Sequence, residues 1–539
     1  MKRLLLILYI SLVVCVCINA QDEWGHMYFN DTDSPGRDIK EYYDHGYIIL
    51  GWDGHYFPSH NWILKTDING EVLWVKRMGE EGAVAGGVNF DVNLSGDVFI
   101  AGAYSGYDTS LDPYVYKINA CGEKEWCWVY QTGNHYDSGS RIVATPDGGC
   151  AAILKYIDHR PDTNRIALAR FSAEGELLWI NHYEGTDSLV HSEDEAFLRY
   201  IEGSGFLISG ACYFEDIPPP HYWWLHPYYI KTDLEGNMQW ESTLLNHIPD
   251  EGGEGFASLV NSRGDYYYSS IRHHYRDQGW VPALIKMDTL GNFEYVQDLA
   301  EGVYQYLQFY RIEWVNDSII AGTADFANEE SNTCTQAILV DTLGNIIKQK
   351  CLLEQGGYSA WMDKTFDGKL LYMTNTIDEN DEFDVYLYKL NQELEYDSIY
   401  TQPFEYDYLC DHPIVEDTLD MENCTLWLDA GPIIRQERPE LKVYPNPAKD
   451  FLVIRLPEYY SVSYQGELFK TTHTNYQYQK NAVLQIFNLN GQLMHEEKLQ
   501  SAQTQSTLNV SNWQGGMYVV RLLVSGQRYG SVKFLVARN

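Results

Sequence analysis

The stretch that decides the fold reads WILKTDINGEVLW, from Trp62 to Trp74. Similar stretches recur along the chain: YVYKINACGEKEW (Tyr114–Trp126), IALARFSAEGELLW (Ile166–Trp179), YYIKTDLEGNMQW (Tyr228–Trp240), ALIKMDTLGNFEY (Ala283–Tyr295), AILVDTLGNIIK (Ala337–Lys348) and VYLYKLNQELEY (Val385–Tyr396). Their turns share one slot, occupied by Gly70, Gly122, Gly175, Gly236, Gly291, Gly344 and Leu394, at spacings of 52, 53, 61, 55, 53 and 50 residues. A period this regular indicates a repeat architecture.

Each copy has the pattern of a β-hairpin, in which an alternating strand ends in Lys-x-Asp or its equivalent and Gly follows where the turn needs positive φ. A second hairpin precedes each copy, with strands such as DHGYIILG (Asp44–Gly51), SGDVFIAG (Ser95–Gly102) and GSGFLISG (Gly203–Gly210). Four strands in about 53 residues, repeated along the chain, predict an all-β fold with the blades of a β-propeller.

The number of blades depends on the two ends of the repeat region. Trp24 occupies the outer-strand slot 50 residues ahead of Trp74, so the first strand can close the last blade. An eighth copy of the inner strand reads CTLWLDAG, from Cys424 to Gly431. We therefore expect eight blades, with seven as the alternative if the Cys424 segment belongs to the linker.

Tryptophan marks the outer strand of each well-preserved repeat, at Trp24, Trp74, Trp126, Trp179 and Trp240. An indole ring can bury roughly 150–250 Å², and we expect these rings to pack between neighbouring blades. The alternative is a row of platforms on which sugar rings stack.

The composition narrows the classes of partner. Asp and Glu number 76 against 38 Lys and Arg, which gives a net charge of −38. A surface this acidic repels phosphate backbones, so nucleic-acid binding is excluded, and docking on anionic lipid is disfavoured. The 45% hydrophobic and 21% charged residues are typical of a globular chain.

The N-terminus has the pattern of a signal peptide over residues 1–20. Lys2 and Arg3 precede the apolar run Leu4–Ile18, and Ala20 supplies the small residue at a cleavage site before Gln21. The two cysteines in the run each follow valine rather than a small residue, so cleaved export is expected rather than lipidation. No other stretch approaches 18 consecutive apolar residues, so no membrane-spanning segment is expected in the mature chain.

Export places the eight remaining cysteines where disulfides persist. Cys334 and Cys351 lie equidistant from one turn, and Cys410 and Cys424 bracket another. We expect a disulfide within each pair, with eight buried thiols as the alternative. No second pair of metal ligands accompanies a CxxC motif, so a zinc site is not expected.

We expect the propeller to span residues 22–431 and a linker to span residues 432–440. The sequence pattern changes after the linker. Residues 441–539 read as short alternating strands, typical of a small Ig-like β-sandwich. Three stretches stand in order: VYPNPAKD (Val443–Asp450), IFNLNGQ with its Asn490-Gly491 turn, and GGMYVVR (Gly515–Arg521), before a last strand at KFLVAR. The residues that define these motifs are Tyr444, Pro445, Asn446, Pro447, Gly491, Gly516 and Tyr518.

These motifs closely resemble the type A C-terminal sorting domain of the type IX secretion system. The resemblance implies passage across the outer membrane by the type IX secretion machinery, followed by release or attachment to the cell surface. The Tyr-rich stretch Pro457–Lys480 is longer than the family usually has there, and we interpret it as a loop insertion.

The repeat itself resembles the tryptophan-docking propellers of pyrroloquinoline-quinone proteins. It resembles still more closely the Gly-rich propeller repeats of secreted Bacteroidetes proteins, with their DGGY and KxDxxGxxxW elements. The quinone enzymes also need adjacent cysteines, and this chain has no Cys-Cys pair. The resemblance therefore implies the fold and not the redox chemistry.

No catalytic motif of the hydrolase, metalloprotease or nucleotide-binding kinds occurs, and no cofactor is expected. Two acidic segments are weak calcium candidates: Asp31-Thr32-Asp33, and a loop with Asp378, Asp381, Glu382 and Asp384. For both, a solvated loop is the alternative. Arg263-Gly264-Asp265 spells an adhesion tripeptide but occupies the slot of a hairpin turn.

Histidines gather on one face of the expected propeller. Eleven of the 16 fall in or beside the loops on that face: His55, His60, His135, His159, His182, His191, His221, His226, His247, His273 and His274. Aromatic residues accompany them, a composition suited to stacking on and hydrogen-bonding polar ligands. The candidate ligand-binding residues are Tyr222, Trp223, Trp224, His226, His273, His274, Tyr275, Trp280, His55 and Tyr56.

Three functions compete for this face. We expect an exported binding protein for a protein or glycan ligand, with ordinary loop packing as the bland explanation of the composition. The alternative is a carbohydrate-active enzyme, a glycosidase or lyase, with His273 and His274 as first suspects, and a structural surface component is third. Convergent acids at the propeller axis would favour the enzyme, and exposed aromatic rows the binding protein.

Overall fold

The computed structural model divides the chain into two compact units, Met1–Leu428 and Asp429–Asn539. It describes residues 24–28, 34–53, 60–79, 85–105, 111–131, 138–158, 163–183, 196–215, 223–245, 251–275, 279–300, 308–327, 333–354, 360–377, 383–428, 441–456, 482–488, 492–499, 505–524 and 527–538. In these residues no helix is long and apolar enough to cross a bilayer.

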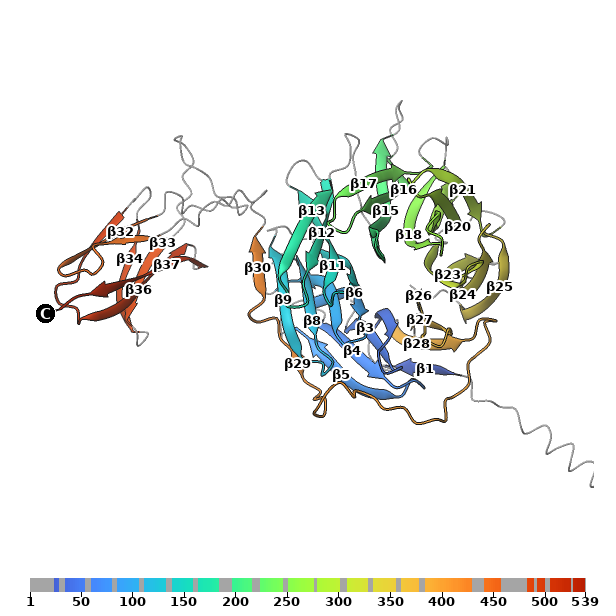
Figure 1. Cartoon of the computed structure of the whole chain (residues 1–539), viewed down its shortest axis with the longest axis horizontal. Coiled ribbons are helices and arrows are strands. Elements are labelled where there is room, and N and C mark those ends of the chain that lie inside the picture. Colours follow the sequence, from blue (N-terminus) through green and yellow to red (C-terminus); the bar gives the residue numbers. More distant parts are fainter. Residues whose placement is uncertain are drawn as a thin grey trace, which may run out of the picture. The chain divides into compact units, whose positions relative to one another are not determined.

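The first unit is a β-propeller, as predicted (Figure 1). Blade 1 contains β2 (Gly36–Glu41), β3 (Tyr47–Asp53), β4 (His60–Thr66) and β5 (Val72–Met78). Blade 2 contains β6 (Ala85–Val92), β7 (Val98–Tyr104), β8 (Asp112–Ile118) and β9 (Lys124–Gln131). Blade 3 contains β10 (Ser138–Ala144), β11 (Cys150–Asp158), β12 (Thr163–Phe171) and β13 (Leu177–Tyr183).

The remaining blades follow the same antiparallel order. Blade 4 contains β14 (Phe197–Ile201), β15 (Gly205–Glu215), β16 (Trp223–Thr232) and β17 (Met238–Thr243). Blade 5 contains β18 (Glu251–Val260), β19 (Tyr266–Tyr275), β20 (Gly279–Asp288) and β21 (Phe293–Asp298). Blade 6 contains β22 (Phe309–Asn316), β23 (Ile319–Ala327), β24 (Thr333–Asp341) and β25 (Ile346–Glu354).

Blade 7 joins the two ends of the repeat region. It contains β26 (Ala360–Lys364), β27 (Leu370–Ile377) and β28 (Phe383–Leu390), and its fourth strand is β1 (Gly25–Tyr28). β1 pairs antiparallel with β28, with Gly25 opposite Tyr388, so the first strand closes the last blade as expected. The first strands of neighbouring blades contact one another around a closed ring, from β2 through to β26 and back to β2.

The described strands therefore make seven blades, and not the eight that the Cys424 strand suggested. That segment forms β30 (Thr425–Leu428), which adds in parallel to the outer edge of β9, with Thr425 opposite Trp128. β29 (Thr418–Leu419) adds in the same way to β5 of blade 1. We call residues Asp397–Leu428 the strap, because Figure 1 shows this segment passing outside β1 and β5 to reach β9.

In blades 1, 2, 3 and 7, the cation at the repeat's Lys-x-Asp position holds the blade together from within. The cation on the third strand reaches the aspartate in the turn between the first two strands. Lys65 Nζ lies 2.6 Å from Asp44, and Lys117 Nζ lies 3.1 Å from Asp97. Arg170 makes the same contact with Asp147 in blade 3. The cation that recurs on the third strand is thus one partner of an ion pair that fixes this strand against the turn of the preceding hairpin.

The repeat tryptophans dock each blade on its neighbour. Trp24 Nε1 donates to the Ile68 carbonyl of blade 1, Trp126 Nε1 to Ala173 of blade 3, and Trp240 Nε1 to Thr289 of blade 5. Trp179 lies against the turn of blade 4, where a Cβ at Gly236 would come 2.5 Å from the indole and where φ is +76°. Only glycine suits both requirements. Trp74 differs, because its Nε1 points to Asp407 of the strap at 3.5 Å.

Three disulfides lie among the described residues. Cys334 bonds Cys351, the pair expected from the sequence. The expected Cys410–Cys424 bond is wrong: Cys410 bonds Cys121 and Cys424 bonds Cys127. The strap carries both cysteines along the outside of blade 2, which brings each one to a cysteine of that blade rather than to the other.

The second unit is a β-sandwich, described here by itself. Its three-stranded sheet contains β31 (Lys442–Tyr444), β32 (Phe451–Arg455) and β35 (Gln505–Asn509). Its four-stranded sheet contains β34 (Leu493–Lys498), β33 (Ala482–Asn488), β36 (Gly516–Val524) and β37 (Gln527–Val536). Leu452, Ile454, Ile486, Val520 and Leu522 meet in its core.

The motif residues of the second unit have distinct places. Tyr444, Pro445, Asn446 and Pro447 connect β31 to β32, and Asn446 Oδ1 accepts the Leu535 N–H at 2.8 Å. Tyr518 is buried on β36, which Gly516 begins. Gly491 lies outside the described residues.

Candidate functional site

A cavity of about 190 Å³ lies where the seven innermost strands meet. Every blade contributes to its wall through its first strand, and Ser209 is added from β15. Side chains alternate along a strand, so residues two apart, such as Asp38 and Lys40 or Arg311 and Glu313, lie on the same side of their strand. The ring visible in Figure 1 therefore encloses a wall whose chemistry is set by seven short segments far apart in the sequence.

Eight charged side chains line this wall. Four are cationic and four anionic: Lys40, Arg141, Arg199, Arg311, Asp38, Asp91, Glu313 and Asp363. The formal charges cancel, in a chain whose overall charge is −38. The cavity is thus a locally neutral but highly polar site, which suits a ligand that both donates and accepts hydrogen bonds.

Ion pairs cross the cavity between blades. Lys40 Nζ lies 3.3 Å from Asp363 Oδ1, linking blade 1 to blade 7. Arg199 Nη2 lies 2.6 Å from Glu313 Oε1, linking blade 4 to blade 6. Arg311 Nη2 lies 3.7 Å from Asp38 Oδ1, farther than a hydrogen bond reaches.

The acids also accept backbone N–H groups. Asp91 Oδ2 accepts the Ala144 N–H of the next blade at 2.8 Å, and Asp363 Oδ2 accepts the Glu41 N–H at 3.3 Å. Asp38 accepts the Ile39 N–H at 2.9 Å and a side-chain N–H from Asn89. The contacts of Asp91, Asp363 and Asn89 link first strands of neighbouring blades, so these contacts stabilise the wall of the cavity.

Burial and charge shift the pKa values of the wall. Burial raises the pKa of Asp91 and of Asp363, with Lys40 opposing the rise in both. Burial alone would lower the pKa of Lys40, but the carboxylates of Asp363, Asp91 and Asp38 raise it above its ordinary value. Lys40 therefore stays protonated at physiological pH, between two carboxyls that part with their protons less readily than usual.

One aromatic ring supports two of the cations. The guanidinium carbon of Arg141 lies 4.4 Å from the centre of the Phe197 ring, and that of Arg311 lies 5.0 Å from it. Cation–π contact of this kind orients guanidinium groups. Arg141 is 3% exposed, and its Nη1 donates to the Ser140 carbonyl at 3.1 Å.

The histidine-rich residues predicted from the sequence lie elsewhere, and blade 5 brings several of them together. His273 is only 1% exposed: its Nδ1 lies 2.7 Å from Asp298 and its Nε2 3.3 Å from Glu251. The Tyr275 hydroxyl donates to Asp298 at 2.6 Å. Burial raises the pKa of Tyr275, and its bond to Asp298 adds to the rise. The two side chains share a carboxylate inside the blade.

The other face of the same hairpin carries a second group. His274 and Trp280 lie with ring centres 4.9 Å apart, and the Arg272 guanidinium lies 3.6 Å from the centre of the Trp280 ring. Arg272 also pairs with Glu254. His226 is buried on β16 of blade 4. Strand pairing places both His226 and His273 in the interior, and the prediction of a ligand-binding face on these loops stays a prediction.

The remaining candidates are only partly described or not described. Trp223 and Trp224 begin β16, but their side chains are outside the description, as are His55, Tyr56 and Tyr222 entirely. The calcium candidates Asp31–Asp33, Asp378, Asp381 and Glu382 also fall outside it. Asp384 is not in a loop but buried on β28. Arg263-Gly264-Asp265 lies in the turn between β18 and β19.

Sequence reasoning missed the axial residues, although a signal was present. First strands such as GRDIKE (Gly36–Glu41) and RIEW (Arg311–Trp314) put charges at alternate positions beside apolar residues. Alternation shows that such charges share a face. The signal for the site was in the charged residues of the first strands and not in the loops.

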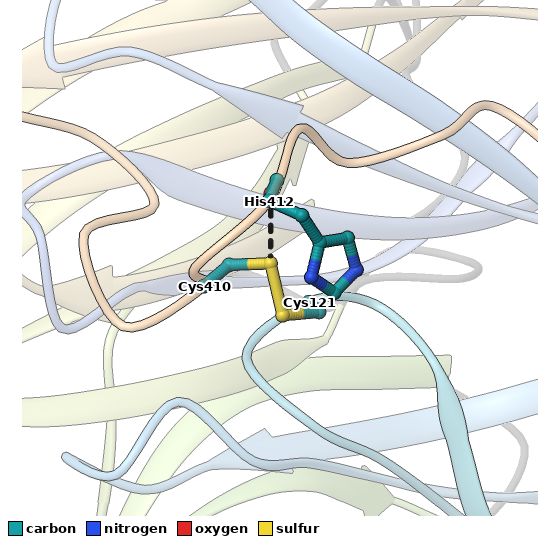
Figure 2. A group of neighbouring side chains, drawn as sticks. All are labelled: Cys121, Cys410 and His412. Atoms are coloured by element: carbon teal, nitrogen blue, oxygen red, sulfur yellow. Dashed lines mark hydrogen bonds between the residues drawn. A yellow bond between two sulfur atoms is a disulfide. The ribbon is translucent and has the colours of Figure 1, made fainter.

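Among the described residues one group of three potential metal ligands is found, Cys121, Cys410 and His412, with ligand atoms within 4.8 Å of one another. Figure 2 shows that the two sulfurs are bonded to each other. A metal binds cysteine as the thiolate, which a disulfide does not offer. This group is therefore a strap disulfide with a histidine beside it and not a metal centre.

Comparison with known proteins gives a clear result for the second unit only. Residues 442–537 match the family model of the secretion system C-terminal sorting domain. No curated protein sequence matches the chain.

Solved structures resemble the propeller at low identity. A structure titled as a polysaccharide lyase, PL25-ulvanlyase, has a TM-score of 0.47 at 9% identity and covers 68% of this chain and 96% of its own. A protein of unknown function from Dyadobacter fermentans has 0.39 at 10%, covering 57% and 94%. The β-propeller domain of the Trilobed protease from Pyrococcus furiosus has 0.38 at 10%, covering 72% and 98%. None of these values informs the chemistry of the axial cavity.

The sandwich topology, the YPNP connection and the family match agree with one another. Residues 442–537 are a secretion system C-terminal sorting domain, and the chain is a β-propeller cargo that this domain directs across the outer membrane to the cell surface or the extracellular space.

Proposed function

We propose that the exported propeller is a binding protein for a glycan, one sugar unit of which enters the axial cavity. The observation that carries the proposal is the cavity itself, whose wall holds eight charged side chains from six of its seven surrounding strands. Sugar hydroxyls both donate and accept hydrogen bonds, and a wall of balanced charge offers partners for both roles.

The size of the cavity favours a small ligand group over a folded partner. Pockets for drug-sized ligands are roughly 300–1,000 Å³, and this one is about 190 Å³. A single ring with hydroxyl groups is on that scale. A protein ligand would instead use the loop face, and that alternative predicts no effect of changes in the cavity.

A carbohydrate-active enzyme is the second candidate, and one observation favours it. Four acids converge on the axis, and the pKa values of Asp91 and Asp363 are raised, as a general acid requires. Both carboxylates, however, accept backbone N–H groups of the neighbouring blade. This structural task makes binding the better-supported function.

The test is a glycan-array screen of the full chain with two variants. The first removes the Arg199–Glu313 pair as a unit (Arg199→Ala with Glu313→Ala), so that neither charge is left buried alone. The second changes Tyr222, Trp223 and Trp224 to alanine and so probes the loop face. Arg263→Ala, in an exposed turn, is the matched control.

We expect the cavity variant to lose at least tenfold in affinity for the glycans that the wild type binds, with an unchanged melting curve, and the control to keep its affinity. Loss in the loop variant alone would move the site to the loop face. Cleavage of a bound glycan would favour the enzyme. Binding of no glycan by the wild type would reject the proposal.

A further inference from the structure

The hydrogen-bonding state of the axial wall differs between its acids and its cations. Each acid already accepts at least one donor. Asp91 and Asp363 accept backbone N–H groups, and Glu313 pairs with Arg199 and accepts the Trp314 N–H at 3.3 Å. A cationic ligand would have to displace these donors, at the cost of leaving strand N–H groups buried and unpaired.

Arg311 differs from Lys40 and Arg199, whose side chains donate to carboxylates within hydrogen-bond distance. Its Nη2 is shielded from solvent and has no hydrogen-bond acceptor among the described residues. The nearest carboxylate, Asp38, is 3.7 Å away and already accepts from Ile39 and Asn89. A guanidinium donor left open inside a protein is costly, and a ligand acceptor would satisfy it.

The surroundings of Arg311 hold its donors in place. The Phe197 ring lies under the guanidinium at 5.0 Å, and Arg141 approaches the same ring at 4.4 Å. Two guanidinium groups converging on one ring form a positive corner inside a cavity that is neutral overall. Guanidinium groups recognise carboxylate, sulfate and phosphate oxygens more strongly than neutral hydroxyls.

We infer that the sugar unit entering the cavity is anionic, with a carboxylate or an ester oxyanion placed against Arg311. The inference rests on the proposed function and names the substrate class for the same site. The attraction is local, because the lining charges cancel and the rest of the chain is strongly acidic. A small acidic sugar should bind where an extended polyanion would be repelled.

The test compares glucuronate with glucose, which differ in a carboxylate against a hydroxymethyl group, and includes glucose 6-sulfate to distinguish carboxylate from sulfate ligands. Saturation-transfer NMR and calorimetry on the full chain would be done with the wild type, Arg311→Gln and the control Arg263→Ala. Gln keeps an N–H donor and removes the charge. Thermal unfolding verifies that each variant is folded.

We expect the wild type to bind at least one of the acidic sugars at least tenfold more tightly than glucose. Arg311→Gln should weaken binding of the acidic sugars at least tenfold and so remove that preference, and the control should keep it. Equal binding of glucose and the acidic sugars would overturn the anionic ligand but not the glycan-binding function. Saturation transfer to none of the three sugars would overturn both.

Discussion

Blades 1 and 2 differ from blades 3 to 6 in what happens at their outer edges. The outer strands β5 and β9 are each paired with a strand of the strap. In the described residues, β13, β17, β21 and β25 are the last strands of their sheets. The propeller is thus closed twice, once by β1 within blade 7 and once by the strap over the two blades that follow.

The same repeat position shows what the strap contributes. In blade 1, Lys65 pairs with Asp44 at 2.6 Å and with Asp407 of the strap at 3.3 Å. In blade 4, the equivalent Lys231 donates to the carbonyl groups of Ser204 at 2.7 Å and Thr232 at 2.6 Å and to Gln239 Oε1 at 3.4 Å. The strap holds eight acids and no Lys or Arg between residues 397 and 428. It therefore adds a carboxylate to a cation whose counterpart in blade 4 is satisfied by carbonyl groups.

Removing both strap disulfides should cause the largest loss of stability among the changes that test the role of the strap. The Cys121–Cys410 and Cys127–Cys424 bonds close loops of 289 and 297 residues. In the chain-entropy account, closing a loop that long stabilises the fold by about 4 kcal/mol or more. We expect that loss in the free energy of unfolding when all four cysteines become alanine, measured by urea denaturation.

The control for this prediction lies in blade 6. The Cys334–Cys351 bond spans only 17 residues, and its removal should cost about 3 kcal/mol or less. Removing either strap disulfide alone should cost about 3 kcal/mol, because the other bond still closes the long loop and leaves a ring of only about 20 residues for the second bond to close. A single strap variant as unstable as the double would show that the strap is not held by two redundant bonds.

Much of the blade architecture could be predicted because its signals are local. The hairpin turns and the 50-residue offset of Trp24 each reflect contacts within a blade or between successive blades. The sorting domain was equally legible, since its motifs are short and ordered. The number of blades could not be predicted in this way, because the Cys424 strand alternates like an inner strand. Alternation does not reveal which sheet edge a strand joins.

The long-range features could not be predicted for the same reason. Cys410 and Cys424 bond to blade 2 because of the path of the strap, which no local pattern specifies. The axial site is assembled from strands far apart in the sequence, as the Lys40–Asp363 contact across 323 residues shows. Alternation indicated that Asp38 and Lys40 share a face, but only ring closure shows what they face.

Substitution of the repeat lysine should give the next largest effect. Lys65→Met leaves the Asp44 carboxylate buried without its cation, and we expect a loss of about 3 kcal/mol. Lys231→Met leaves only carbonyl groups unpaired, and we expect a loss of about 1 kcal/mol or less at pH 7. Equal losses in the two blades would mean that the strap carboxylate does not matter to Lys65.

The pH dependence separates these two lysines further. Burial lowers the pKa of Lys231 to about 8, from an ordinary value of 10.5. Between these values the unfolded chain holds a proton that the folded chain has released, so stability rises with pH across that window. The free energy of unfolding of the wild type should therefore rise by about 1 to 2 kcal/mol relative to that of Lys231→Met between pH 8 and pH 10. An unchanged difference would contradict a lowered pKa for this lysine.

The smallest effect concerns His412, which lies on the strap beside the Cys121–Cys410 bond (Figure 2). Its hydrogen bonds to Asp411 of the strap and to Glu123 of blade 2 raise its pKa above 6.5. A raised histidine pKa stabilises the docked strap below about pH 6.5, and that contribution is lost as the pH rises through the folded value.

By NMR titration, Glu123→Gln should lower the His412 pKa part of the way, because Asp411 remains. Removing the Cys121–Cys410 bond should lower it equally if the strap then leaves blade 2 at this point. A His412 pKa that responds to Glu123→Gln but not to loss of the disulfide would mean that the remaining strap contacts hold this segment in place, and would assign the docking to the ion pairs and β29 rather than to the bond.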